Sequence, residues 1–165
     1  MELNSLYQDI ILDHYRNPIG RGRLLEPAGS AFHVNPTCGD EITVDVATDS
    51  DGMLAVGHEG QGCSISQASA SVMTELVQGQ DVIHVEHTRE AFLALMHAQG
   101  QGEPDEVVLG DGVAFAGVAK YPARVKCALL PWMALQDALI KAELLRTPQA
   151  PSHALKVPER EDQER

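Results

Sequence analysis

The residues of this chain best suited to chemistry are three cysteines and one aspartate. Cys38 and Asp40 lie two positions apart in the stretch NPTCGD at 35–40, where a proline and a glycine favour a turn. Cys63 follows in GCSIS, and Cys127 ends RVKC. Three thiolates and one carboxylate complete the tetrahedral ligand shell that zinc prefers. The four residues predict a metal site, provided that the fold brings them together.

Spacing alone leaves two interpretations open. The four residues do not form the paired C-x-x-C motifs of structural zinc modules, and free cysteines are often simply buried in a core. Two features favour the metal site: Cys38 falls in a polar turn, and Cys63 begins an expected helix, whose dipole favours a thiolate. Zinc on these ligands would leave a net charge of about −2. Arg124 and Lys126 flank Cys127 and either compensate for that charge from outside the ligands or are simply solvated.

Other candidate groups have weaker spacing. His84, Glu86 and His87 form a rival ligand cluster in HVEH, but no nearby residue completes its shell, and polar residues in such a segment are more often exposed. The sequence has neither the glycine-rich phosphate-binding motifs nor the G-x-S-x-G nucleophile motif. The remaining histidines show no partnered spacing: His14, His33, His58, His97 and His153.

The composition restricts the classes of partner. A length of 165 residues suits one domain, and 12 basic against 24 acidic residues leave a formal net charge of −12. This charge disfavours nucleic acids and anionic membranes as partners. It favours proteins with basic surfaces, or it only keeps the chain soluble. Three widely spaced cysteines, no secretory signal pattern and no apolar run long enough to span a bilayer predict a protein of the reducing cytoplasm.

Hydrophobic periodicity predicts an α+β fold with a small antiparallel sheet. Alternation over residues 41–46 indicates a strand, the turn signal at 49–52 returns residues 53–59 beside it, and a shorter strand around 32–34 is expected alongside. The inward residues of the first of these strands are Ile42, Val44 and Val46. An amphipathic helix over residues 5–16 precedes them, with an expected apolar face of Leu3, Leu6, Tyr7, Ile10 and Ile11.

Helices are expected to follow the sheet and to pack against it. The pattern predicts helices over 64–78, 88–99 and about 122–145, with a short one near 113–115. Pro131 lacks the N–H that would bond the carbonyl of Cys127, so we expect a kink or break beside that residue. The domain is expected to occupy residues 1–146. The charged, proline-containing tail at 147–165 is expected to be disordered.

Four motifs resemble the NifU-like/IscU family of iron–sulfur cluster assembly proteins, and most closely its SufU branch. They are LYQDIILDHYRNP at 6–18, PTCGD at 36–40, GCSIS with ASAS at 62–66 and 68–71, and PARVKC at 122–127. The resemblance extends over about residues 3–145. It implies a SufE/NifU-like fold in which about three strands pack against helices, with the site at one end of the sheet.

Two departures from the scaffold members of that family favour zinc and sulfur relay. The scaffolds have a histidine before the last cysteine, where this chain has Lys126, which cannot act as an ordinary ligand while protonated. The stretch between Cys63 and Cys127 also looks longer than in the scaffolds, as in the SufU branch. The alternative is a scaffold that assembles and transfers a [2Fe–2S] cluster on the same ligands, and a purely structural zinc domain is a third possibility.

The resemblance to the SufU branch implies a mechanism and its partners. A pyridoxal-phosphate cysteine desulfurase of the SufS type forms a persulfide, and one of its histidines replaces a cysteine of this chain at the zinc. Cys38 would be the released residue and the persulfide acceptor, while Asp40, Cys63 and Cys127 hold the metal. The sulfur would then pass to downstream iron–sulfur scaffold proteins. Such a protein is a sulfurtransferase-type persulfide carrier that stimulates the desulfurase, rather than a stand-alone enzyme.

Overall fold

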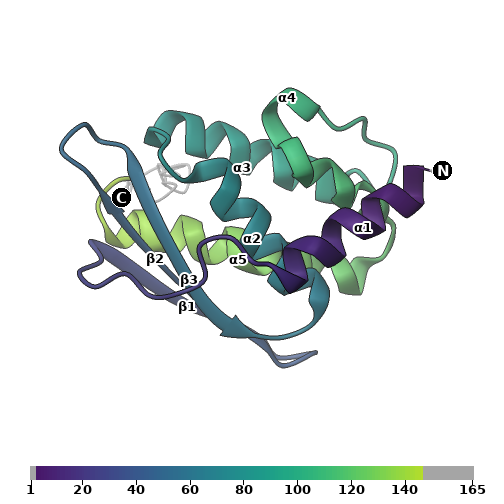
Figure 1. Ribbon diagram of the computed structural model, residues 1–165, viewed down its shortest axis with the longest axis horizontal. Coiled ribbons are helices and arrows are strands. Elements are labelled where there is room, and N and C mark those ends of the chain that lie inside the picture. Colours follow the sequence, from purple (N-terminus) through teal and green to yellow (C-terminus); the bar gives the residue numbers. More distant parts are fainter. Residues whose placement is uncertain (1–2, 147–165) are drawn as a thin grey trace, which may run out of the picture.

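The computed structural model describes residues 3–146 and has the expected α+β architecture (Figure 1). One helix precedes three strands, and the remaining helices follow them. In chain order the elements are α1 (Leu3–Arg16), β1 (Gly29–Asn35), β2 (Asp40–Thr48), β3 (Leu54–Gln61), α2 (Ser64–Val77), α3 (Val82–His97), α4 (Glu106–Leu109), the 3-10 helix η1 (Gly110–Lys120) and α5 (Pro122–Lys141).

The sheet is antiparallel with strand order β1-β2-β3, and helices cover one of its faces. Helix α5 packs against β1 and β2, while α2 packs against β3. The predicted inward residues of β2 are all buried: Ile42, Val44 and Val46. On β1, Phe32 and Val34 point away from the helices and are exposed. This alternation is the two-residue period of a sheet with one face covered by helices, and it confirms the inward residues expected for β2.

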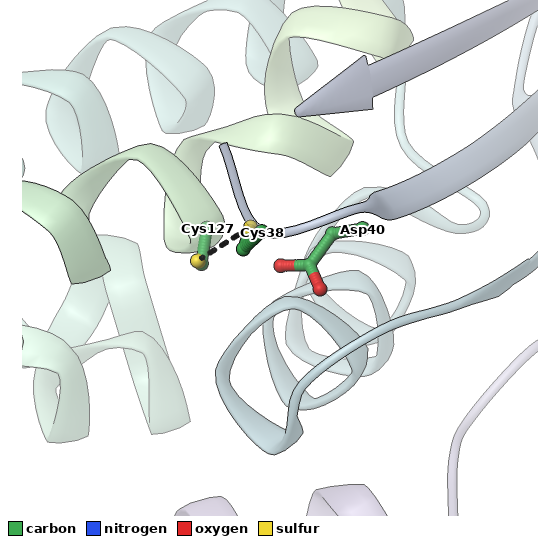
Figure 2. A group of neighbouring side chains, drawn as sticks. All are labelled: Cys38, Asp40 and Cys127. Carbon is green, nitrogen blue, oxygen red and sulfur yellow. Dashed lines mark hydrogen bonds between the residues drawn. The ribbon is translucent and has the colours of Figure 1, made fainter. Parts of the chain in front are cut away.

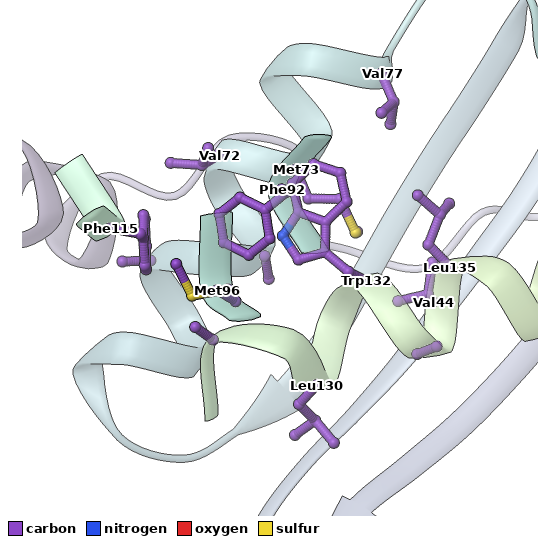
Figure 3. Packing of buried hydrophobic residues seen from close by; sticks show 14 of the residues in the cluster. Val44, Val72, Met73, Val77, Phe92, Met96, Phe115, Leu130, Trp132 and Leu135 are labelled. Carbon is purple, nitrogen blue, oxygen red and sulfur yellow. The ribbon is translucent and has the colours of Figure 1, made fainter. Parts of the chain in front are cut away.

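An aromatic cluster joins the helices to one another (Figure 3). Trp132 of α5 stacks on Phe92 of α3 at 4.6 Å between ring centroids, and Phe92 meets Phe115 of η1 edge-on at 5.5 Å. The indole Nε1 of Trp132 donates to Ser69 Oγ of α2 at 3.1 Å, and that hydroxyl donates to the carbonyl of Ala128 at 2.6 Å. Four helical elements are thus held by one buried network in which each polar group has a partner.

Two details of the expected helices were decided by tertiary packing rather than by local pattern. Leu3 and Leu6, expected on the buried face of α1, are exposed, and the residues of this helix that are buried are Ile11 and His14. Helix α5 is not broken at Pro131 but runs through it from Pro122 to Lys141. Pro131 is itself buried, and contacts of α5 with β1, β2 and α2 hold the helix together despite the missing hydrogen bond.

Two other helices differ in extent from the expectation. Helix α3 begins six positions earlier than expected, because the side chain of Asp81 accepts from the amide of His84 at 2.9 Å and caps it. The short helix expected near 113–115 is part of the longer 3-10 helix η1. No helix between residues 3 and 146 has both the length and the apolar character needed to cross a bilayer. The tail at 147–165, expected to be disordered, lies outside the described residues, and the domain boundary at 146 stays a prediction.

Candidate metal centre

The turn between β1 and β2 presents Cys38 to solvent. Asn35 pairs with Asp40 across the two strands, and the amide of Gly39 closes the turn by donating to the carbonyl of Asn35 at 2.8 Å. Gly39 has a φ of +73°, a left-handed conformation that glycine adopts without strain. Cys38 is exposed at this turn. The residue can therefore be reached from solvent without any unfolding of the sheet.

Asp40 is buried at the start of β2 and is held by Cys63. Its Oδ1 accepts from the backbone N–H of Cys63 at 2.9 Å, and its Oδ2 accepts from the Cys63 thiol at 3.3 Å. Cys63 is the N-cap residue of α2, as the expected helix start implied. Gly62 permits this approach, because a Cβ at that position would lie 2.5 Å from Asp40 Oδ1. These contacts therefore hold the side chain of Asp40 and the start of α2 at Cys63 together.

Cys127 brings a third segment of the chain to the site. It is buried near the start of α5, and its Sγ lies 3.6 Å from Cys38 Sγ. Figure 2 shows the side chains of Cys38, Asp40 and Cys127 directed toward one another. One potential ligand atom from each of these three residues lies within 4.8 Å of the other two. Cys63 is outside this tight group and joins it through its contact with Asp40.

The pKa values of the cluster describe its metal-free state. Burial opposes ionisation of Asp40, but the hydrogen bonds from the Cys63 amide and from the thiols of Cys38, Cys127 and Cys63 outweigh it and lower the pKa of this carboxyl group. Burial and then the neighbouring Asp40 raise the pKa of the Cys127 thiol far above its ordinary value. Without a cation the cluster thus contains a carboxylate beside a protonated thiol. A metal ion would deprotonate that thiol.

The donor set fits zinc. Three sulfur donors and one carboxylate come from three separate segments, and this number and kind of ligands suit tetrahedral zinc. The Cys63 amide fixes one oxygen of Asp40, which orients the carboxylate as partners of metal ligands commonly do. All four residues that the sequence predicted as ligands are therefore brought to one end of the sheet.

The two predicted neighbouring cations are exposed on α5. Arg124 lines a cavity of about 750 Å³ together with residues of α1, the start of α2 and η1, among them Tyr7, Ser64 and Lys120. Lys126 is exposed. Within residues 3–146, neither Arg124 nor Lys126 forms an ion pair with Asp40. Charge compensation by these residues stays a prediction.

The rival cluster in HVEH does not form. Glu86 makes an ion pair with Arg89, one turn further along α3, and His84 and His87 are exposed. Sequence reasoning missed a different group, in which His14 contacts Ser71 and Asp111. These partners are 57 and 97 positions away from His14, so no local spacing could have indicated them.

Fold and site together define a class of protein: a small α+β domain with three cysteines and an aspartate gathered at one end of an antiparallel sheet. The family model described as "NifU-like N terminal domain" matches residues 6–128 of the chain. This chain belongs to that family, as the resemblance of its motifs implied.

Similar proteins include a sulfurtransferase and a scaffold protein of iron–sulfur cluster assembly. The chain is 42% identical over 141 residues to "Zinc-dependent sulfurtransferase SufU" of Bacillus subtilis, covering 86% of this chain and 94% of that protein. It is 38% identical over 138 residues to "Iron-sulfur cluster assembly scaffold protein IscU" of Streptococcus pyogenes, covering 84% of this chain and 85% of the relative.

Solved structures show the same fold. A putative iron–sulfur cluster assembly scaffold protein for the SUF system from Fervidobacterium islandicum superposes with a TM-score of 0.72 at 34% identity, covering 84% of this chain and 99% of the other. The N-terminal part of a NifU-like protein from Brucella abortus gives a TM-score of 0.75 at 29% identity, covering 86% and 96%. The expected NifU-like α+β fold is confirmed.

Proposed function

We propose that this protein is a zinc-dependent sulfur acceptor in iron–sulfur cluster assembly, which stimulates a cysteine desulfurase and relays the sulfur. The observation that carries the proposal is the contrast between two touching thiols: Cys38 is exposed on a turn, and Cys127 is buried on a helix 3.6 Å away. Cys38 is thus accessible to a partner, while the buried Cys127 anchors the cluster. Cys63 is also exposed, but its thiol and its amide are held by Asp40 at the start of α2. The identity of 42% to a zinc-dependent sulfurtransferase supports this assignment.

In the proposed reaction Cys38 accepts a sulfur atom from a persulfide on the desulfurase. The Cys38 thiolate attacks the terminal sulfur of the persulfide, a new S–S bond forms on Cys38, and the old S–S bond breaks. The desulfurase cysteine leaves with the electron pair as a thiolate, so no external oxidant or reductant is needed. Bound zinc stabilises the thiolate form of the cysteines at neutral pH.

Each of the other cluster residues has a positional role in this proposal. The Asp40 carboxylate keeps a negative charge beside Cys38, and the hydrogen bond that it accepts from the Cys63 amide fixes the position of that carboxylate. Cys127 is buried and therefore serves as a metal ligand rather than as an acceptor. Arg124 and Lys126 lie near enough in sequence to Cys127 to offset the negative charge of the centre.

The proposed partners follow from this reaction. The sulfur donor is a pyridoxal-phosphate cysteine desulfurase of the SufS type, and the recipients are downstream iron–sulfur scaffold proteins. An acidic chain with a formal net charge of −12 favours protein partners over nucleic acids or membranes. Reduced cysteines are required throughout, which supports a place in the cytoplasm.

A second candidate function is assembly of a [2Fe–2S] cluster on the same residues. The identity of 38% to a relative named as an IscU scaffold favours it, and thiolates bind iron–sulfur clusters as well as zinc. The lysine at position 126, where the family's scaffolds have histidine, disfavours it. Metal analysis of the purified protein separates the two functions: the first predicts a colourless zinc protein, and the second a brown one that contains iron.

The deciding experiment is intact-mass analysis after incubation with the organism's own cysteine desulfurase and free cysteine. The relay function predicts a gain of one sulfur atom that maps to Cys38, together with faster desulfurase turnover. Cys38→Ser should abolish both effects, whereas Thr37→Ala, an exposed position of the same turn, should retain them. A purely structural zinc domain predicts that Cys38→Ser reduces stability only. Unchanged turnover without any added sulfur would refute the relay.

A further inference from the structure

A second group of potential metal ligands lies outside the cysteine centre, where α1, α2 and η1 meet. His14 of α1 is buried, and its Nε2 lies 2.7 Å from Asp111 Oδ2 of η1 and 3.5 Å from Glu75 Oε2 of α2. One potential ligand atom from each of the three residues lies within 4.8 Å of the other two. Glu75 is twelve positions beyond Cys63 on α2, which corresponds to roughly 18 Å along the helix.

The imidazole of His14 is oriented as a metal ligand would be. Its Nδ1 lies 2.7 Å from the buried Ser71 Oγ, and the same hydroxyl oxygen accepts from the backbone N–H of Ile19 at 2.8 Å. An Nδ1–H that donates to Ser71 leaves the lone pair of Nε2 directed at the two carboxylates. Histidine ligands of metals are typically fixed by such a bond from the other ring nitrogen.

The same atoms also have the order of a serine–histidine–aspartate triad, but they cannot act as one. Ser71 is completely buried in the middle of α2, and its oxygen is engaged by the amide of Ile19. No substrate can therefore reach this hydroxyl group.

The two carboxylates supply negative charge, and their exposure opens the group to ions from solvent. The side chains of Glu75 and Asp111 are 43% and 45% exposed, whereas that of His14 is 5% exposed. An ion could therefore enter from the carboxylate side and keep water molecules as additional ligands. In the described part of the chain, the ion-pair partner of each of these two carboxylates is His14, so a neutral imidazole leaves two negative charges side by side.

We propose that His14, Glu75 and Asp111 bind one divalent first-row transition metal ion, independently of the cysteine centre. One imidazole nitrogen and two carboxylate oxygens without sulfur suit Mn²⁺ or Fe²⁺. The ion takes the place of the proton between Nε2 and Asp111, and the two atoms separate slightly to admit it. Nitrogen and oxygen donors are harder ligands than the thiolates of the cysteine centre. The two centres therefore select different ions.

The test uses Mn²⁺ as the probe and zinc-loaded full-length protein, so that the thiolates are already occupied. Titration followed by the electron paramagnetic resonance signal of free Mn²⁺ should show one ion bound per chain. Asp111→Asn and Glu75→Gln, on two different elements, should each weaken binding about tenfold or more, the usual cost of disturbing a metal site. Glu90→Gln makes the same charge change at an exposed position of α3 and should leave the affinity unchanged.

A second measurement tests whether the ion binds beside the buried His14. Bound Mn²⁺ should broaden the ring resonances of His14 in nuclear magnetic resonance spectra, and Asp111→Asn should diminish this broadening at the same Mn²⁺ concentration. The proposal is overturned if millimolar Mn²⁺ causes no loss of free signal, or if Asp111→Asn and Glu75→Gln both bind as tightly as the unmodified chain. Equal weakening by Glu90→Gln would also overturn it, because the binding would then reflect net charge alone.

Discussion

Cys38 Sγ and Cys127 Sγ lie 3.6 Å apart although 89 positions separate them in the chain. The first belongs to a turn of the sheet, and the second to the helix that packs against that sheet. Asp40 and Cys63 tie the start of α2 to the same point. A metal bound here would therefore clamp three segments that are distant in sequence, which links metal binding to the stability of the whole fold.

Removal of the metal should lower the melting temperature. Zinc that binds only the folded chain stabilises it by about 2.7 kcal/mol at a concentration of 100 times Kd. For a domain of this size such a loss corresponds to a drop of roughly 5–10 °C. Differential scanning calorimetry of zinc-loaded and chelated samples measures the shift. Identical melting temperatures would show that the cysteines do not clamp the fold.

Gly62→Ala should disturb the metal centre without removing any ligand. The added Cβ would lie 2.5 Å from Asp40 Oδ1 and 2.7 Å from Ser66 Oγ, so the carboxylate must move. We expect zinc affinity to fall about tenfold, as when a partner that orients a ligand is lost. Competition with a chromogenic chelator measures the affinity.

Gly117→Ala is the matched control for that substitution. A Cβ at position 117 meets no heavy atom within 4 Å, so zinc affinity should not change. If Gly62→Ala bound zinc as tightly as this control, the close approach of Gly62 to Asp40 would have no part in shaping the centre.

Stability should fall as the pH drops below neutrality because of His58. Burial lowers the pKa of this histidine, even though its Nε2 donates to the carbonyl of Ile19 at 2.8 Å, an interaction that raises the pKa. The folded state therefore binds a proton less readily than the unfolded chain, in which a histidine titrates near about 6.5. The stabilisation is complete above that pH and is lost as the pH falls toward the lower folded value.

Urea unfolding between pH 8 and pH 5 should show this dependence, with a slope of up to about 1.4 kcal/mol per pH unit for one proton. His58→Gln keeps an N–H donor for Ile19 but cannot titrate, so the slope should diminish. His97→Gln, at an exposed position of α3, should retain it. A slope that stays the same in His58→Gln would place the linked proton elsewhere.

Ser69→Ala should destabilise the fold by about 1–3 kcal/mol, because the buried indole N–H of Trp132 would lose its partner. Ser5→Ala, at an exposed position of α1, should change stability by less than about 0.5 kcal/mol. Chemical unfolding measures both differences. Equal stability of the two variants would show that the hydrogen bond between Trp132 and Ser69 contributes nothing to the core.

The sequence by itself determined the four candidate ligands and most of the fold. Turn residues around Cys38, the helix start at Cys63 and the alternation of Ile42, Val44 and Val46 are local signals, because each depends on neighbouring positions only. The family could also be recognised from the sequence, because its motifs are short and contiguous. At Pro131 local pattern left either a kink or a break open, and α5 continues without a break. Local pattern failed at Leu3 and Leu6, which it placed on the apolar face of α1 and which are exposed.

Only the tertiary structure decided which side chains actually meet. It showed that Cys38 is exposed whereas Cys127 is buried. It also brought His14 to Glu75 and Asp111, on three elements with no shared motif. Contacts of this kind depend on how helices pack around a common core, and packing is a property of the whole chain that no short window of sequence contains.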